Sequence, residues 1–268
     1  MGDASGEDER PASDGPDADR KPPADPANGD GPVPSDPAAL ARDLLERVRR
    51  REPTDLLLGA LADLDESALA AVGDDRRTAL AFWLDVYNAA AQRLLDRRPG
   101  LFDSRWRFFR ATAVTVAGVE LSLDDIEHGI LRGGRSKYGL GYLPRLGRTG
   151  LPRSYGLDPD PRIHFALNCG AASCPAILAY DPATVDDALD DATALCLADT
   201  VEYDPDRDRV RLPRVCLWFV GDFGGRSGLH AFLREFEQIP DGATPSIRFQ
   251  GYDWDLDPRK FADRRRRE

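Results

Sequence analysis

The residues best suited to chemistry are two cysteines in the phrase that runs from Asn168 to Pro175. Gly170 frees the backbone there, and Pro175 is a good first residue for a new helical turn. Cys174 would then be the N-cap of that turn, facing unpaired backbone N–H groups. Such a field stabilises the thiolate, the nucleophilic form of cysteine. The spacing therefore favours Cys174 as a nucleophile, with Cys169 as its reserve.

The same two thiols also fit a structural role, because free cysteine is among the most buried residue types. For the other two cysteines this is the preferred interpretation. Cys196 falls on the apolar stripe of a predicted helix, and Cys216 stands beside Leu217 and Trp218. Four cysteines in a chain of 268 residues do not indicate a disulfide framework in a cytosolic protein.

Two of the three histidines could serve such a thiol. In the predicted helix 123–132, Glu127 lies at the edge of the apolar stripe and His128 one step round from it. A half-buried carboxylate needs a partner. His164 is predicted on the same face of a strand as Asn168, where it could pair with Glu127, orient a catalytic group or satisfy the core. His230 opens an amphipathic helix and is predicted to face solvent.

Two asparagines have structural or orienting roles. Asn88 falls on the buried stripe of the longest predicted helix, so its amide needs hydrogen-bond partners inside the domain. Asn168 stands directly before the first cysteine of the 168–175 phrase. Either could hold that phrase, and Asn88 could also orient an imidazole.

Two different sites could be assembled from these parts. If His128 or His164 reaches Cys174 or Cys169, and Glu127 orients the ring, the result is a Cys-His-acid site suited to acyl transfer or amide hydrolysis. If both thiolates and both imidazoles converge, the Cys2His2 set is a tetrahedral zinc site. The spacing around the cysteines matches no common zinc module, so we expect no cofactor, and zinc is the alternative.

The elements that must position these residues alternate between helix and strand without a regular βαβ rhythm, which predicts an α+β fold. Hydrophobic periodicity makes residues 74–97 the central helix of the core. Ala117-Gly118 predicts a hairpin turn, and Ser122 with Asp125 predicts a capping box. Helices are predicted at 37–51, 53–64, 74–97, 123–132, 185–197, 215–223 and 229–236; strands at 113–121 (a hairpin), 162–168, 204–209 (a second hairpin) and 247–254.

Composition limits the class of protein. The chain has 47 acidic residues against 36 basic ones, a formal net charge of −11 and only three lysines. Phosphates repel such a body, which argues against a nucleic-acid partner. An acidic, lysine-poor surface suits a chain solvated in concentrated salt. No apolar run is long enough for a membrane span. The acidic amino terminus predicts no secretory signal, so we expect a cytoplasmic location.

The charge also divides the chain. Residues 1–37 contain no aromatic residue and carry ten acids against three bases, a composition that predicts a disordered acidic tail. Residues 38–262 show no repeat and no second low-complexity linker, and they are predicted to form a single globular domain. We expect helices packed on a small mixed or antiparallel sheet in that domain.

Five phrases in the same order resemble the domain of unknown function 547 family over about 75–255. The phrases are 81–89 (AFWLDVYNA), 121–132 (LSLDDIEHGILR), 160–170 (DPRIHFALNCG), 173–175 (SCP) and 252–254 (YDW). The resemblance implies an α+β domain that has been compared with papain-like and transglutaminase-like thiol enzymes. The plant type carries leucine-zipper segments, and this chain has the acidic tail in their place.

The leading hypothesis is a cytosolic thiol hydrolase or acyl-transfer enzyme acting on a peptide or amide. Its catalytic residues would be Cys174, Cys169, His128, His164 and Glu127. The competing hypothesis is a non-catalytic protein-interaction domain in which the same residues knit the core, and its partner would be an unidentified peptide or protein.

Overall fold

The computed structural model describes residues 32–146, 151 and 155–262. Most of the predicted acidic tail lies outside these residues. The described chain is a single α+β domain with small sheets, as the sequence predicts. Among the described residues, no helix has both the length and the apolar character needed to cross a membrane.

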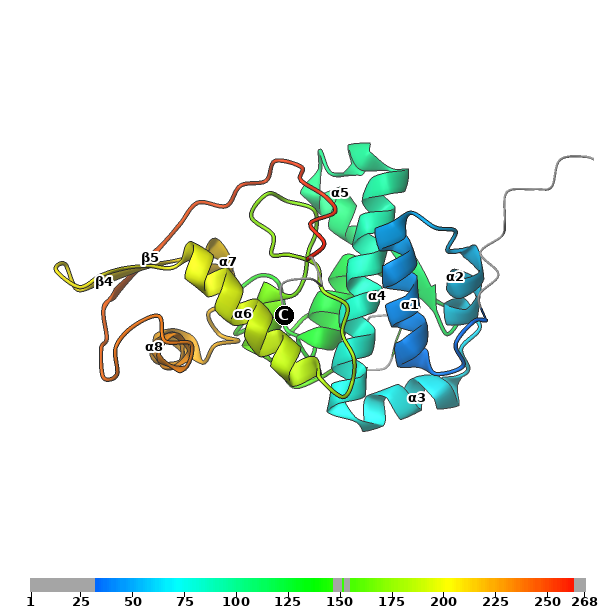
Figure 1. The fold of residues 1–268 in the computed structure, drawn as a ribbon, viewed down its shortest axis with the longest axis horizontal. Coiled ribbons are helices and arrows are strands. Elements are labelled where there is room, and N and C mark those ends of the chain that lie inside the picture. The colour runs from blue at the N-terminus through cyan, green and yellow to red at the C-terminus, as the bar shows by residue number, and fades with distance from the viewer. Residues whose placement is uncertain (1–31, 147–150, 152–154, 263–268) are drawn as a thin grey trace, which may run out of the picture. The chain divides into compact units, whose positions relative to one another are not determined.

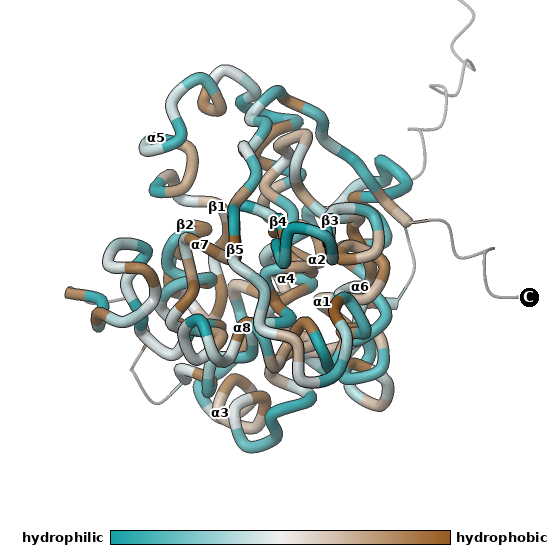
Figure 2. The backbone as a smooth tube through the Cα atoms, turned by 90° about the vertical axis from the view of Figure 1, so that its left-hand side faces the viewer, coloured by the Kyte–Doolittle hydropathy of each residue, from teal (hydrophilic) through white to brown (hydrophobic). Residues whose placement is uncertain are grey.

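Helix α4 (Arg76–Arg97) is the centre of the larger hydrophobic core. The side chain of Asp75 caps it by accepting a hydrogen bond from the Thr78 amide at 2.9 Å. Helices α1 (Pro37–Arg50) and α3 (Glu66–Asp74) pack against α4, and α2 (Asp55–Ala62) packs against α1, all on one side of α4 (Figure 1). In Figure 2, turned by 90°, α4 again lies in the interior. The larger core is thus built around this helix, as its periodicity predicts, and the sheets of the domain are small.

Three of these helices agree with their predicted ranges, and α3 was missed. Residues 66–74 form a separate helix because Asp65 caps its start, accepting from the Ala68 amide at 2.7 Å. Asp75 then adopts extended backbone before α4 begins. Two short elements after α4 were also missed: the 3-10 turn η1 (Pro99–Leu101) and helix α5 (Arg105–Arg110).

The predicted hairpin is present as β1 (Thr112–Val116) and β2 (Val119–Ser122), which pair antiparallel. Ala117 and Gly118 both have positive φ, +49° and +73°, which is the backbone that a two-residue turn of this kind requires. The capping box is also present. Ser122 Oγ donates to Asp125 Oδ2 at 2.6 Å, and the Asp125 amide donates to Ser122 Oγ at 3.2 Å.

The capping box opens the predicted helix, but most of that helix is a π-helix, η2 (Asp125–Leu131). Its wider turn is seen in the hydrogen bond from the Arg132 amide to the Glu127 carbonyl, five residues back, at 2.9 Å. π-Turns are rare and concentrate at functional sites. Here Glu127 and His128 on the helix are buried, and so is Arg132, the residue that follows its last turn.

The predicted strand at 162–168 is wrong. Residues Pro161–Phe165 form a 3-10 helix, η4. Pro161 fixes the backbone of its first turn, and the Asp160 side chain accepts from the Arg162 amide at 3.0 Å. Ile163, His164 and Phe165 are all buried on this short helix, so the alternation of apolar and polar residues does not mark the two faces of a strand.

The second half of the domain has its own hydrophobic cluster. Helix α6 (Val185–Thr200) leads into β3 (Glu202–Asp204) and β4 (Arg209–Leu212), which form the second predicted hairpin. Strand β5 (Ser246–Phe249) joins β4 in parallel, so this three-stranded sheet is mixed. Helices α7 (Arg214–Trp218) and α8 (Gly225–Glu235) supply further buried side chains to this hydrophobic cluster.

These last elements lie on the opposite side of α4 from α1–α3 (Figure 1). Several of them differ from prediction in length: α6 ends three residues later than predicted, and α8 begins four residues earlier. The helix predicted at 215–223 ends at Trp218 and continues as turns, and the strand predicted at 247–254 ends at Phe249.

Candidate functional site

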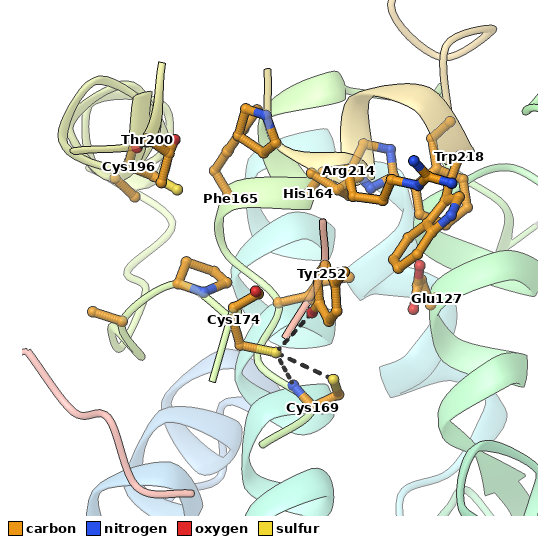
Figure 3. A pocket seen from close by; sticks show the side chains of 18 of the residues that line it. Glu127, His164, Phe165, Cys169, Cys174, Cys196, Thr200, Arg214, Trp218 and Tyr252 are labelled. Atoms are coloured by element: carbon orange, nitrogen blue, oxygen red, sulfur yellow. Dashed lines mark hydrogen bonds between the residues drawn. The ribbon is translucent and has the colours of Figure 1, made fainter. Parts of the chain in front are cut away.

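A large pocket, about 1850 Å³ in volume, takes its walls from both hydrophobic clusters. All five residues predicted to be catalytic line it: Glu127, His128, His164, Cys169 and Cys174. Aromatic rings form another part of the wall. The ring centres of Trp218, Tyr252 and Trp254 lie 4.5–5.8 Å from one another. Figure 3 shows the two cysteines beside Tyr252 in this pocket.

The two predicted asparagines fix the start of the cysteine loop. Asn88 on α4 accepts a hydrogen bond from the Asn168 amide at 2.9 Å and donates to the Ala166 carbonyl at 3.1 Å. The Asn168 side chain accepts from the Gly170 amide at 2.8 Å and donates to the Pro175 carbonyl at 2.6 Å. Both side chains are fully buried and fully engaged, so they hold the loop in one shape.

The C-terminal segment holds the loop from its other side. The amides of Ala172 and Ser173 donate to the carbonyls of Asp255 and Asp253, at 2.8 and 3.2 Å. The Lys260 ammonium donates to the Cys174 carbonyl at 3.2 Å and to the carbonyls of Ala171 and Ala172. The cysteine loop is therefore clamped between α4 and residues 253–260.

Within the loop, the two sulfur atoms lie 3.2 Å apart. The sulfur of Cys174 also accepts from the Cys169 amide at 3.3 Å, and the Tyr252 hydroxyl lies 3.3 Å from it. Figure 3 marks all three contacts. Cys174 thus has three close donors, while its side chain still lines the pocket.

These contacts separate the two thiols in acidity. Hydrogen bonds from the Cys169 thiol, from Tyr252 and from backbone amides lower the pKa of Cys174 to about 6, although burial opposes the shift. The hydrogen bond to Cys174, together with burial, raises the pKa of Cys169 well above its ordinary value. Burial and the neighbouring thiolate raise the pKa of Tyr252. These shifts favour the thiolate form of Cys174, with Cys169 and Tyr252 as its proton donors.

The predicted reason for this acidity is wrong. No helical turn begins at Pro175, since residues 175–180 are irregular apart from a bridge at Ile177. Cys174 is therefore not a helix N-cap. A neighbouring thiol, a phenol and loop amides stabilise its negative charge in place of a helix terminus.

Glu127 is the second group with unusual acidity. Burial raises its pKa to about 7, and the charge of Arg132 only partly offsets this. The Tyr87 hydroxyl donates to Glu127 Oε2 at 3.4 Å. Burial, followed by the charge of the nearby Glu127 carboxylate, raises the pKa of Tyr87, so this phenol lies within electrostatic reach of that carboxyl.

His128 is held as a neutral ring. Burial, followed by the charge of Arg132, lowers its pKa well below the ordinary value. The Arg132 guanidinium can only donate, so at 2.9 Å its partner His128 Nδ1 must be an acceptor. The proton is then on Nε2, which lies 3.6 Å from Asp124 Oδ1. Both ring nitrogens therefore face groups other than the thiols.

His164 belongs to a buried ionic cluster. Its Nε2 lies 2.9 Å from Asp222 Oδ2, and Arg132 contacts the same carboxylate at 2.6 and 3.1 Å. Burial lowers the pKa of His164. Burial would raise the pKa of Asp222, but the hydrogen bonds from His164 and Arg132 outweigh it and hold this pKa below the ordinary value. The His164 ring stacks on Phe219 at 4.4 Å.

The structure therefore brings the predicted residues to one pocket without forming the predicted Cys-His pair. Among the described residues, no hydrogen bond joins either pocket thiol to an imidazole. Nor does the described part of the chain contain a group of three or more His, Cys, Asp or Glu side chains arranged to hold a metal ion. The two thiols and the two imidazoles do not form the Cys2His2 zinc site.

Three residues of the site were missed as contributors. Tyr252 is 78 positions from Cys174, and Asp222 is 90 positions from Arg132. Periodicity and spacing do not report contacts over such distances. The signal for Arg132 was present, because it stands one helical turn after His128 on a helix with a buried face. His230, predicted to face solvent, is half-buried and contacts the Pro245 carbonyl at 2.9 Å.

Comparison with known families is informative over the middle of the chain. Residues 73–195 match the family model described as a protein of unknown function, DUF547. The chain contains a DUF547 domain. Neither the curated proteins nor the solved structures give a match.

The DUF547 domain includes α4, η2, η4 and the cysteine loop, and so all five residues predicted to be catalytic. Trp218, Tyr252 and Trp254 of the pocket wall lie beyond its matched end at residue 195. The pocket of this DUF547 domain is therefore completed by side chains outside the matched stretch.

Proposed function

We propose that the chain is a cytosolic thiol enzyme that hydrolyses a peptide or amide, or transfers its acyl group, with Cys174 as the nucleophile. One observation carries this role: the sulfur of Cys174 has three close donors and lines a large pocket. A cysteine thiolate is the reactive form, and its ionisation near neutral pH removes the need for a general base to form it.

Glu127 is the proton carrier in this scheme. With a pKa of about 7, it is close to the value at which one group can both give and take a proton. The Cys174 thiolate attacks the carbonyl carbon, the C–N bond breaks, and protonated Glu127 gives its proton to the leaving amine. Water or an acceptor amine then attacks the thioester, its proton passes to the Glu127 carboxylate, and Cys174 leaves as a thiolate.

The imidazoles have a positioning role. His164 is fixed by Asp222 and His128 by Arg132, at 2.9 Å each, so neither is free to act as the base of a Cys-His pair. This differs from the arrangement expected from the sequence. The proposed chemistry is that of a papain-like or transglutaminase-like thiol enzyme in which Glu127, and not a histidine, transfers the proton.

Cys169 was predicted as the second-choice nucleophile. In this proposal it is a proton donor to Cys174. Its high pKa keeps it protonated. Replacing it with serine keeps a donor of similar size, whereas alanine removes the donor. Cys169→Ser is therefore expected to retain the acidic Cys174, and Cys169→Ala to lose it.

Alkylation with iodoacetamide tests the thiolate directly. In a Cys196→Ser/Cys216→Ser background, the rate constant should be half-maximal near pH 6, where Cys174 titrates. At that pH the rate should exceed that of free cysteine by about tenfold, because the larger thiolate fraction outweighs the lower nucleophilicity of an acidic thiol. A rate equal to that of free cysteine would contradict the role of Cys174.

Catalysis itself is tested with a panel of fluorogenic peptide amides. Wild-type chain should release the fluorophore and form a thioester adduct, detected by intact mass. Cys174→Ser should do neither while keeping the same melting temperature as wild type. Cys196→Ser is the matched control, since it removes a pocket-lining thiol whose pKa burial raises to about 11.

A second candidate function is a non-catalytic protein-interaction domain. Between residues 138 and 146, five large apolar side chains are exposed, among them Tyr138 (67%), Tyr142 (62%) and Leu146 (93%). Exposed apolar groups gathered in this way mark interaction surfaces. On this function, Cys174→Ser would lower the melting temperature and leave partner binding intact. A stable Cys174→Ser variant that has lost amide hydrolysis would exclude it.

A further inference from the structure

The cysteine loop places two thiols in position to form a bond with each other. Their sulfur atoms lie 3.2 Å apart, whereas the bond in a disulfide is about 2.05 Å long. The loop between them already turns back on itself, because the Cys174 amide donates to the Ala171 carbonyl at 2.9 Å. Gly170 supports this turn with a positive φ of +91°.

The two thiols also differ in ionisation, which suits the formation of a disulfide by oxidation. Cys174 is held as a thiolate by its donors, and a thiolate is the form that a peroxide oxidises. Cys169 stays protonated beside it and is the nearest group able to resolve an oxidised sulfur. Both line the pocket, so a small oxidant can reach them although their residues are only 6% and 7% exposed.

The other two cysteines lack these features. Cys196 lies on α6 and is half-buried, with its pKa raised to about 11 by burial. Cys216 lies in the second hydrophobic cluster, and burial raises its pKa as well. They remain thiols at neutral pH and provide internal controls for any effect on the Cys169–Cys174 pair.

We propose that Cys169 and Cys174 are a modification site for hydroperoxides, and that oxidation closes them into a reversible disulfide. The Cys174 thiolate attacks the terminal oxygen of the hydroperoxide, the O–O bond breaks, and an alcohol (water, from hydrogen peroxide) leaves with a proton from solvent. The sulfur of Cys169 then attacks the resulting sulfenic acid, and hydroxide leaves and combines with the Cys169 proton as water. A dithiol returns both residues to thiols by exchange.

The disulfide is independent of the proposed amide chemistry, because it needs only the two thiols and an oxidant. Where both hold, oxidation removes the nucleophile, and a reductant restores it. In a reducing cytosol, disulfides of this kind are transient and catalytic or redox-sensing, in contrast to structural ones. Failure of the chain to hydrolyse any amide would leave the disulfide untouched, since its readouts are mass and thiol count.

The experiment uses the full chain carrying Cys196→Ser/Cys216→Ser, treated with hydrogen peroxide at pH 7. Intact mass should fall by about 2 Da as both free thiols are lost, and dithiothreitol should restore both. With Cys169→Ser added, oxidation should stop at a sulfenic acid on Cys174 that dimedone captures. With Cys174→Ser added, Cys169 should keep its thiol at the same peroxide exposure.

The relative oxidation rates of the cysteines can be compared within the wild-type chain. Mass mapping should show Cys174 oxidised at least about tenfold faster than Cys196 or Cys216, because only Cys174 is a thiolate. Sulfinic acid on Cys174 without a disulfide would overturn the proposal. So would equal oxidation of Cys169 in the presence and absence of Cys174. Circular dichroism of each variant confirms that it is folded before oxidation.

Discussion

The phenol of Tyr252 lies 3.3 Å from the sulfur of Cys174, although 78 residues separate them in the chain. The ring is held by Trp218 and Trp254, whose centres lie 4.9 and 4.5 Å away. The two tryptophan rings therefore fix the position of Tyr252, and the Tyr252 hydroxyl supplies the hydrogen bond to Cys174. The C-terminal segment tunes the chemistry of a loop that belongs to the DUF547 domain.

Tyr252→Phe removes this donor and keeps the packing of the ring. A hydrogen bond to a charged group contributes about 1.5–3 kcal/mol, so the pKa of Cys174 should rise by about one unit or more. The pH profile of iodoacetamide alkylation measures this shift. Tyr138→Phe, an exposed phenol outside the cysteine loop, is the control and should leave the profile unchanged. An unshifted profile in Tyr252→Phe would show that the phenol does not stabilise the thiolate.

Glu127 and Cys174 together give an expected pH dependence. The amide reaction needs Cys174 ionised, which requires a pH above about 6, and Glu127 protonated, which requires a pH below about 7. The profile of kcat/KM should therefore be bell-shaped, with its limbs near these values. Glu127→Gln should lower kcat and abolish the alkaline limb. The Glu127 proposal fails if that limb persists in Glu127→Gln.

Much of the frame around this site could be predicted from sequence. The long helix, both hairpins and the capping box between Ser122 and Asp125 follow from periodicity and local hydrogen bonding. Burial of Glu127 and Asn88 follows from their place on helix stripes. These are local patterns, in which residues three or four positions apart meet because of helix geometry.

The features that could not be predicted from the sequence depend on contacts between residues far apart in the chain. The 162–168 segment alternates like a strand, but Asn88 satisfies its backbone groups from α4, 80 residues away. The acidity of Cys174 was assigned to a helix terminus and instead comes partly from Tyr252. His164 pairs with Asp222 across 58 positions, and neither spacing nor composition could have paired them.

Asp222 joins His164 to Arg132, and its loss should destabilise the fold. Asp222→Asn leaves the fully buried Arg132 guanidinium without its carboxylate, and breaking a buried pair costs about 3–5 kcal/mol. Urea unfolding at pH 7 measures the loss. Asp103→Asn, at an exposed position, should change the free energy of unfolding little. Equal stability of the two variants would contradict a supporting role for the cluster.

The same cluster makes stability depend on pH at the acidic end. The pKa of Asp222 is lower in the folded chain than its ordinary value. Its contribution is therefore complete above the unfolded Asp pKa of about 3.9 and is lost as the pH falls through the lower folded value. The gap in unfolding free energy between wild type and Asp222→Asn should narrow as the pH is lowered below about 4. A gap that is the same at pH 7 and at acidic pH would count against this linkage.

Asn88 offers a test of how the cysteine loop is held. Asn88→Ala removes one acceptor and one donor from buried backbone groups of residues 166 and 168, at a cost of about 1–3 kcal/mol. Because the loop then loses its fixed shape, the alkylation midpoint of Cys174 should move above pH 6. Gln238→Ala removes a half-buried amide whose hydrogen bond goes to the Phe236 carbonyl and not to the cysteine loop. It should cost less stability and leave the midpoint in place.

Arg214 is the expected determinant of substrate choice if the pocket binds an acyl donor. It is half-buried in the pocket wall beside Trp218, and the described residues give its guanidinium no ion pair. A guanidinium in that position can bind a carboxylate through two parallel hydrogen bonds. Arg214→Gln should raise KM by about tenfold for peptide amides that carry an acidic side chain, with little change for neutral ones. Arg211→Gln, exposed and paired with Glu202 at 3.2 Å, is the matched control. An equal rise in KM for acidic and neutral substrates would mean that Arg214 shapes the pocket without reading charge.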